Sequence, residues 1–596
     1  MNAKTRGSIT YCIIGTGFAG TCALWHVVQR LTDPRRRPSL SPSAVTIVTV
    51  ERGPVNGPGY PYAKDNVQLA HRCNNEASTM GIHGNDFVDW LTESKPWLIR
   101  DHPELVLETH PGIDLSEWQP DNGEFYPRAL FGLYLEKRFQ EAVERARTHG
   151  IDAQQYVRHE AVDGYATEQG FTLSLRSLDT EQEFTVDGID RVLLSIGHWQ
   201  SKATDPLSGE SGYVTSPYPP DAVKAAVAER IRSRRARGER PCVFVQGMGP
   251  SGIDAIMTMC GDGEFTYTDD GHIASYQPAA QAGEEPLHII AGSRSGFFSP
   301  VRGPLVPYEP RHLTEERLAE IRHDHQGHLK IERILELLDK DLRQATAGAV
   351  GWNDIKSPRY HSAEEKLARD LRDSYTGNVV YTLALKARRM RFYNQLEPSD
   401  KATYDRLLDT HFIRTAVPMP SANAEKLLAL MDAGILTTVK QGYDAPHTAV
   451  GDDGAFRVTY RSDEGRQSTL RADCVIRASG QDFSMENHPS PLVQNLLRRG
   501  EIVPHEEGGY VTGGIALDAR GGYRVTKRAG GGCVPSPRLT SFGSPVRFWQ
   551  HEHNFAGAFV EAAEWVADEW LDAAAAVTAN AVAVDGPGLV TSETGS

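Results

Sequence analysis

Two short apolar runs in this chain lead straight into clusters of glycine. The first run is Tyr11–Ile14 and the second is Val243–Gln246. Continuous apolar runs of this length, bounded by glycine, predict buried strands. Each run is followed by a glycine-rich turn and then by a predicted helix, so we expect two strand–turn–helix units far apart in the chain.

Both glycine clusters have the spacing Gly-x-Gly-x-x-Gly. The candidate cofactor-binding residues are Gly15, Gly17, Phe18, Ala19 and Gly20 in the first cluster, and Gly247, Gly249, Pro250, Ser251 and Gly252 in the second. In such a unit, backbone N–H groups and a helix N-terminus can bind a pyrophosphate. One motif is a weak signal, because glycine-rich turns also occur in chains that bind no nucleotide. Two motifs separated by more than a domain's length predict two dinucleotides and electron transfer between them.

An acidic residue ends the strand predicted after the first motif. Val45–Val50 is rich in β-branched residues, and Glu51 and Arg52 follow it. An acid at this position can hydrogen-bond a ribose hydroxyl, and we assign both residues to the first dinucleotide site. The distance from motif to acid exceeds the usual ~20 residues, and we place the excess in a loop at 34–42. The alternative is a surface glutamate that only ends a strand.

The corresponding strand after the second motif ends differently. The apolar run 287–292 is followed by Ser293 and Arg294. A guanidinium can bind a 2′-phosphate through several donors, whereas a glutamate would repel it. We therefore predict FAD at the first site and NADPH at the second. The alternative is an arginine that is simply solvated at a strand end.

Both halves of the chain close in the same way. Alternating segments at 171–178 and 456–461 predict hairpins, and each leads to an apolar strand that ends at a glycine, Gly197 or Gly480. Such an ending lets the chain pass close to a dinucleotide, so Gly480 joins the cofactor-binding residues. Charged helical spacing between the halves predicts a helical subdomain, because a structureless connection of that length is uncommon.

The predicted fold is α/β, with two Rossmann-like dinucleotide-binding domains and a mainly helical insertion. The FAD-binding domain is expected in two parts, 1–215 and 484–572, and the NADPH-binding domain in two parts, 235–310 and 436–483. The helical insertion is expected at 311–435, and it is the candidate surface for a homodimer contact. The Ala/Val/Gly-rich segment 573–596 predicts a disordered tail.

Composition limits the partners of the protein. The chain has 596 residues, 40% of them hydrophobic, and a formal net charge of −15, which argues against nucleic-acid and acidic-membrane partners. No stretch approaches the roughly 20 apolar residues that span a bilayer, and residues 1–8 lack the apolar core of a signal peptide. The seven cysteines include no Cys-x-x-Cys pair, which disfavours a disulfide framework or a dithiol redox centre. We therefore expect a cytoplasmic protein.

Several further segments, taken with the glycine motifs, resemble the two-dinucleotide flavoprotein monooxygenases. The resemblance is greatest for the FAD/NAD(P)-binding subgroup that includes amino-acid N-oxygenases. It rests on segments in the order of that subgroup, namely 57–62, 74–80, 86–91, 126–135 and 293–296. Asn74 begins the segment that resembles the flavin-side loop. The resemblance spans about residues 8–570, and within the subgroup the chain is most similar to the aspartate N-oxygenases called nitrosuccinate synthases.

The resemblance implies the reaction. NADPH would reduce FAD, the reduced flavin would react with O2, and the amine of a small polar amino acid, aspartate first, would be N-hydroxylated or taken on to the nitroso level in antibiotic or other specialised-metabolite biosynthesis. The flavin carries the oxygen chemistry in that family, so no side chain is predicted as catalytic. The chain departs from the subgroup at 70–73, where His71 and Arg72 replace apolar residues. We expect these polar groups near the flavin, where they would favour a charged substrate.

An amino-acid substrate brings carboxylates, whose burial requires cationic partners. Arg547, between the last predicted strand and the closing helix, is the first candidate, and Arg302, just past the NADPH turn, is the second. Arg388 and Arg391 are further candidates at i, i+3 spacing. For each of them, a structural or surface role is the alternative.

Two histidine-rich segments resemble metal-ligand clusters, but neither is accompanied by further ligands at the spacing that is typical of metal sites. They are 323–328 and 551–553, and no metal site is predicted. Two other functions stay open: a flavoprotein oxidoreductase that inserts no oxygen, and a non-catalytic protein that has kept its nucleotide folds. The intact glycines of both motifs weigh against the second.

Overall fold

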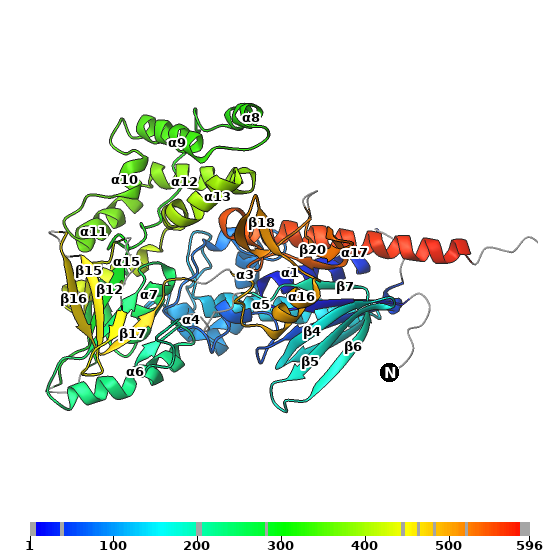
Figure 1. Ribbon diagram of the computed structural model, residues 1–596. Coiled ribbons are helices and arrows are strands. Elements are labelled where there is room, and N and C mark those ends of the chain that lie inside the picture. Colours follow the sequence, from blue (N-terminus) through cyan, green and yellow to red (C-terminus); the bar gives the residue numbers. More distant parts are fainter. Residues whose placement is uncertain are drawn as a thin grey trace, which may run out of the picture.

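The computed structural model describes residues 8–35, 41–197, 205–279, 284–442, 448–461, 465–480, 484–518 and 522–584. It contains two large sheets, each with a glycine motif after its central strand, and a layer of helices at one end of the molecule (Figure 1).

The first sheet has β1 (Ile9–Ile14) at its centre, parallel to β2 (Val45–Glu51) on one side and to β7 (Arg191–Leu194) on the other. The full strand order is β20 (Arg524–Ala529), β21 (Gly532–Ser541), β7, β1, β2 and β3 (Asp152–Val157). Side chains alternate between the two faces of a strand. Tyr11 and Ile13 therefore pack with the helices α1 (Phe18–Thr32), α5 (Arg128–Thr148) and α17 (Ala556–Val584). Cys12 and Ile14 face the opposite core, which includes α16 (Pro491–Arg499).

The second sheet repeats this plan around β9 (Cys242–Gln246). It is parallel to β12 (His288–Ser293) and to β17 (Cys474–Arg477), and β13 (Leu436–Lys440) and β8 (Tyr213–Val214) extend the sheet on either side. The helix after the glycine motif is α7 (Pro250–Cys260). The predicted α/β fold with two related nucleotide-binding sheets is confirmed.

The predicted hairpins lie at corresponding places in the two halves. The first belongs to a three-stranded antiparallel sheet of β4 (His159–Thr167), β5 (Gly170–Ser177) and β6 (Glu183–Ile189). The second is β15 (Phe456–Arg461) with β16 (Gln467–Ala472), next to β14 (Thr448–Val450). Two small hairpins are β10 (Glu264–Tyr267) with β11 (Ile273–Gln277), and β18 (Pro504–Glu507) with β19 (Tyr510–Ile515). The remaining helices of the two nucleotide-binding parts are α2 (Gly59–Tyr62), α3 (Phe87–Asp101), α4 (Pro103–Leu107) and α6 (Pro220–Arg235).

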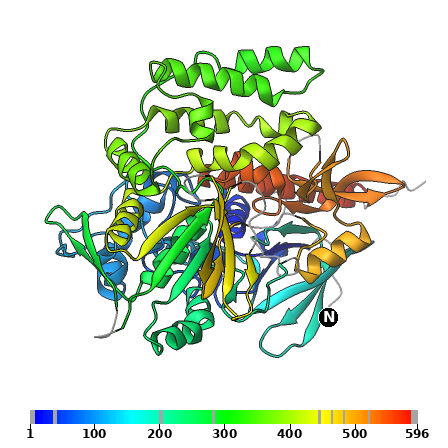
Figure 2. The ribbon, with the colours of Figure 1, turned by 60° about the vertical axis from the view of Figure 1, so that its left-hand side comes forward.

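The insertion forms a helical layer with its own hydrophobic core, which stands apart from both sheets in the two ribbon views (Figures 1 and 2). Its helices are α8 (Glu315–Asp324), α9 (Ile331–Ala345), α10 (Trp352–Lys356), α12 (Val379–Arg389), α13 (Pro398–Thr403) and α14 (Asp409–Ala416). Between α10 and α12 in the chain, α11 (Ala363–Ser374) packs Leu367 into the core of the second sheet. The helix after α14, α15 (Ser421–Asp432), packs Leu427 and Leu430 into the same core. It leads directly into β13, as the crossover helix of a parallel sheet does. The expected insertion, 311–435, therefore includes two helices, α11 and α15, that pack on the NADPH-side sheet.

The last helix is longer than the sequence pattern indicated. We expected disorder from residue 573, but α17 continues to Val584. The reason is the run of alanines after Leu571, since alanine has the highest helix propensity. Residues 585–596 of the expected tail lie outside the described residues. Within the described ranges, no helix is long and apolar enough to cross a membrane.

Candidate active site

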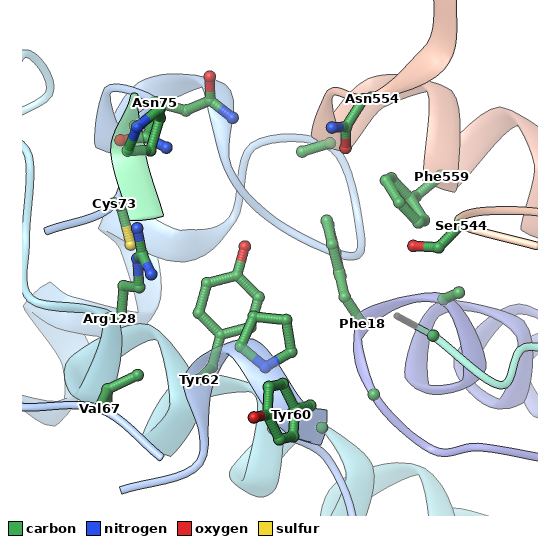
Figure 3. A pocket seen from close by; sticks show the side chains of 18 of the residues that line it. Phe18, Tyr60, Tyr62, Val67, Cys73, Asn75, Arg128, Ser544, Asn554 and Phe559 are labelled. Carbon is green, nitrogen blue, oxygen red and sulfur yellow. The ribbon is translucent and has the colours of Figure 1, made fainter. Parts of the chain in front are cut away.

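A cavity of ≈ 1550 Å³ lies where the two nucleotide-binding parts and the insertion meet. Its lining comes from the start of α1, the start of α7, the helices α12 and α14, and the segment before α17. Figure 3 shows one region of it, with aromatic and polar side chains from distant parts of the chain around one space: Phe18, Tyr62, Asn75, Arg128, Asn554 and Phe559. Such a volume lies above the range of ordinary single-ligand pockets, and it suits a large cofactor together with a small substrate.

The first glycine motif opens on this cavity. Gly15, Gly17, Phe18 and Ala19 line it, and Gly17 caps α1 without a side-chain hydrogen bond, so the first N–H groups of the helix have no side-chain cap. A helix start of this kind can bind a phosphate. Gly20 does not line the cavity. It lies against the backbone of Gly15, where an added Cβ would come within 2.0 Å of the Gly15 carbonyl oxygen.

Glu51 also lines the cavity, at the end of β2. Its Oε2 accepts hydrogen bonds from the Thr16 N–H and hydroxyl, each at 2.9 Å, and Oε1 accepts the Gly53 N–H at 2.8 Å. These bonds hold the carboxylate beside the glycine turn, where a ribose would lie, and leave it further acceptor capacity. Arg52 and Asn74 line the same cavity. The residues present therefore fit the adenosine and pyrophosphate of FAD.

The second glycine motif reaches the cavity through the start of α7. Pro250 and Ser251 line it, as does Gly480 at the end of the final strand. Gly247 has φ of +130° and lies against the Ala478 carbonyl, and Gly252 lies against Gly247. At Gly249, the N-cap of α7, an added Cβ would meet no atom of the described residues within 4 Å. Protein packing therefore does not require glycine at 249, whereas close approach of a phosphate would.

Ser293 ends β12 and Arg294 follows it, both outside the lining of the large cavity. Several cations gather around this turn. Burial lowers the pKa of His411 to about 4, and the positive charges of Arg414, Lys356 and Arg294 contribute to the same shift. The Arg414 guanidinium also donates to Ser295 Oγ at 2.8 Å. Lys356 and Arg414 come from the insertion, so the sequence motif alone did not identify them as companions of Arg294.

Arg302 lines the cavity and lies against two aromatic rings. Its Cζ is 5.4 Å from the ring centroids of both Phe125 and Tyr381. The Nε atom of Arg302 is buried and has no hydrogen-bond partner in the described part of the chain. Among the same residues, no carboxylate oxygen lies within 4.0 Å of the Arg302 guanidinium. Burial lowers the pKa of Arg302, although the charges of Tyr381 and Glu76 oppose that shift. Such a cation attracts an anionic group into the cavity.

Arg547 is placed differently from our expectation. It does not line the cavity, and its Nη2 donates to Asp405 Oδ1 at 2.9 Å in a buried ion pair. Asp405 belongs to a π-helical turn of the insertion, η4 (Tyr404–Leu408), and also accepts hydrogen bonds from Tyr393 and Tyr510. Because this carboxylate already neutralises Arg547, the geometry favours Arg302 over Arg547 for a substrate carboxylate.

The two other arginine candidates are divided between cavity and surface. Arg388, on α12, lines the cavity, and its Nε donates to the His551 carbonyl at 2.7 Å. Burial lowers the pKa of Arg388, against the charges of Tyr404, Asp409 and Glu552. Arg391 instead forms a surface ion pair with Glu561.

The expected polar groups before Asn74 are structural. His71 is fully buried, and its Nε2 lies 3.2 Å from the Asp254 carbonyl oxygen and from Thr258 Oγ1, both on α7. Arg72 donates to the carbonyls of Glu108 and Phe125. Neither residue lines the cavity. They fasten the flavin-side loop to its neighbours, and the interpretation that they face the flavin was wrong.

The segment 551–553 holds a residue that our sequence interpretation considered only as part of a metal cluster. Glu552 lines the cavity within a second π-helical turn, η5 (Trp549–His553). Among the described residues, no group of three or more His, Cys, Asp or Glu side chains is arranged to hold a metal ion.

Comparison with known proteins gives the following similarities. The chain is 26% identical over 489 residues to the nitrosuccinic acid synthase npaA of Aspergillus oryzae, covering 68% of this chain and 71% of that protein. It is 23% identical over 525 residues to YdhS of Escherichia coli, an uncharacterised protein, covering 83% and 87%. Among solved structures, the FAD-bound cadaverine monooxygenase DfoA of Erwinia amylovora matches with a TM-score of 0.47 and 10% identity, covering 95% of this chain and 94% of that one.

The model of a nucleotide-binding family matches residues 12–199, and its description is FAD-NAD(P)-binding. This segment begins in β1 and includes the first glycine motif, Glu51, Asn74 and β7 of the first sheet. The match and the geometry of the cavity agree on the class of cofactor. The match to a model described as FAD-NAD(P)-binding agrees with the cofactor class that the first glycine motif predicted.

Proposed function

We propose that the protein is an FAD- and NADPH-dependent monooxygenase that N-hydroxylates the amine of a small acidic amino acid, with aspartate as the first candidate. Further rounds would take the same nitrogen to the nitroso level. The product would enter the biosynthesis of a specialised metabolite.

The observation that carries the proposal is Arg302, a cation in the wall of a cavity that both glycine motifs reach. A substrate carboxylate would supply the anion that the described part of the chain does not place beside this guanidinium. Phe125 and Tyr381 hold the planar group in position. The similarity to a protein described as a nitrosuccinic acid synthase supports the same class of substrate.

When bound, FAD would supply hydride acceptance from NADPH and activation of O2. The chain's own groups would position the reactants: the start of α1 binds the pyrophosphate, Glu51 binds a ribose, and the start of α7 binds the second dinucleotide. At the far end of the nicotinamide nucleotide, Arg294, Lys356 and Arg414 gather positive charge suited to a 2′-phosphate. The aromatic and aliphatic lining excludes water from the reacting centre.

The test is the NADPH consumption of the FAD-loaded protein in air with single amino acids, together with the peroxide released. For a substrate, we expect faster NADPH oxidation and a peroxide yield well below the NADPH consumed. The proposal would be overturned if the amount of peroxide released equalled the amount of NADPH consumed with every amino acid and with simple amines. That result would favour an oxidoreductase without oxygen insertion.

A further inference from the structure

The cavity wall contains two buried carboxylates: Glu160, which is paired with Arg176, and Glu552, whose exposed fraction is only 3%. The residue lies in η5, between the last strand of the first sheet and α17. The same wall includes Asn554, which points into the space in Figure 3. A buried carboxylate costs free energy unless it is hydrogen-bonded and paired with a cation.

One oxygen of Glu552 is held by the insertion. Oε1 accepts the backbone N–H of Asn394 at 2.9 Å, and Asn394 lies in η3 (Tyr393–Gln395). The carbonyl oxygen of His551, the residue before Glu552, accepts a hydrogen bond from Arg388 Nε. These bonds fix the turn against α12 and η3, so the carboxylate keeps one place in the cavity wall.

Among the described residues, the charged groups around Glu552 place no lysine or arginine close to its carboxylate. From its own turn, His553 Nδ1 lies 3.9 Å from Oε2, and burial lowers the pKa of His553 to about 4, which keeps this imidazole neutral near pH 7. His551 is held between Asp405 and Asp409. Arg388 on α12, Arg391 after it and Lys401 on α13 contribute charge from a distance. In the described part of the chain, no lysine or arginine nitrogen lies within 4.0 Å of this carboxylate.

We propose that Glu552 binds the ammonium group of the amino-acid substrate and takes its proton, so that the nitrogen is a neutral amine when it is oxygenated. This inference rests on the proposed function. One N–H bond of the ammonium breaks and one O–H bond forms on Glu552, with no change in oxidation state. The nitrogen keeps the electron pair, and the proton leaves to water after the product dissociates.

The acid–base properties of the site suit this transfer. Burial, only partly offset by the Asn394 hydrogen bond and by the charges of His551, Arg391 and Lys401, raises the pKa of Glu552 to about 7. A base is most effective when its pKa is near the working pH. The carboxylate form increases as the pH rises through about 7, so amine binding and oxidation should increase over the same interval.

The experiment compares the FAD-bound wild type with Glu552→Gln, in which the amide oxygen can still accept the Asn394 N–H. Glu561→Gln, an exposed carboxylate on α17, is the matched control. Calorimetry measures the binding of L-aspartate and of succinate, which lacks the amine. We expect Glu552→Gln to weaken aspartate binding at least tenfold and to leave succinate binding unchanged or tighter, while the control changes neither.

Two pH profiles complete the test. Wild-type affinity for aspartate should rise through about pH 7 while that for succinate does not, and this measurement needs no variant. N-oxidation by Glu552→Gln should instead rise about tenfold per pH unit up to the pKa of the substrate amine. Equal losses for aspartate and succinate, or identical profiles of variant and wild type, would overturn the role of Glu552. If the wild type oxidises no amine, the proposed function itself fails, and the two failures are thus distinguishable.

Discussion

Arg302 and Arg547 end the same tetrapeptide, Ser-Pro-Val-Arg, yet the fold uses them differently. Arg547 meets Asp405, a residue 142 positions earlier that the insertion brings to it. Arg302 meets two aromatic rings and the cavity. Local sequence contains no information about the distant partner, so our sequence analysis ranked Arg547 before Arg302, the reverse of the order that the geometry favours.

Replacing Arg302 by methionine should weaken substrate binding specifically. We expect the KM for the amino acid to rise at least tenfold, about 1.4 kcal/mol, because the carboxylate loses its cation. The KM for NADPH should stay within twofold. Steady-state kinetics measures both, with Arg391→Met as the surface control, and equal changes in the two constants would contradict the assignment.

Replacing Arg294 by alanine should affect the other substrate. The KM for NADPH should rise tenfold or more, about 1.4 kcal/mol, because the 2′-phosphate loses a guanidinium. NADH, which has no 2′-phosphate, should be hardly affected. Equal losses with NADPH and NADH would show that Arg294 does not contact that phosphate.

Among the elements, the two strand–turn–helix units were predictable because strand, glycine turn and helix are adjacent in the chain. α15 was misassigned because it follows the helices of the insertion directly in the chain, and only its packing on the second sheet separates it from them. The two π-helical turns η4 and η5 had no sequence signal. Their contact depends on Asp405, Arg547 and His551, which come together only in the folded chain.

Two glycines of the second motif should respond differently to alanine. Gly249→Ala should fold normally and lose NADPH affinity at least tenfold, because its methyl group would enter the space for the phosphate. Gly252→Ala should reduce stability, since its Cβ would lie 2.1 Å from the Gly247 carbonyl oxygen. Thermal unfolding and nucleotide titration measure the two effects. A Gly249 variant that melts as early as the Gly252 variant would contradict this distinction.

The contact between η4 and η5 should be strongly coupled. Asp405→Ala leaves the Arg547 guanidinium buried without its carboxylate, an effect worth about 3–5 kcal/mol in other buried pairs. Adding Arg547→Met should recover part of that loss, and the melting temperature of the FAD-bound protein should show it. Additive losses in the double variant would mean that the pair contributes no coupling.

In the whole molecule, the cavity belongs to no single domain. The FAD-side part contributes Glu51 and Glu552, the NADPH-side part contributes Ser251, and the insertion contributes Tyr381 and Arg388. An ion pair of 2.7 Å between Arg128 on α5 and Asp254 on α7 joins the two nucleotide-binding parts beside it. The sequence predicted the two sheets and their cofactors. It did not predict that the insertion forms part of the cavity wall, because that depends on how the three parts pack.

The central claim is that oxygen from O2 is transferred to a substrate nitrogen. The most direct measurement is mass spectrometry of the products formed by the FAD-loaded protein from NADPH and L-aspartate under 18O2. We predict an N-hydroxylated product that carries one 18O atom, and no label when the 18O is supplied as water instead. Unmodified amino acid, with the electrons of NADPH recovered as labelled peroxide, would contradict the account.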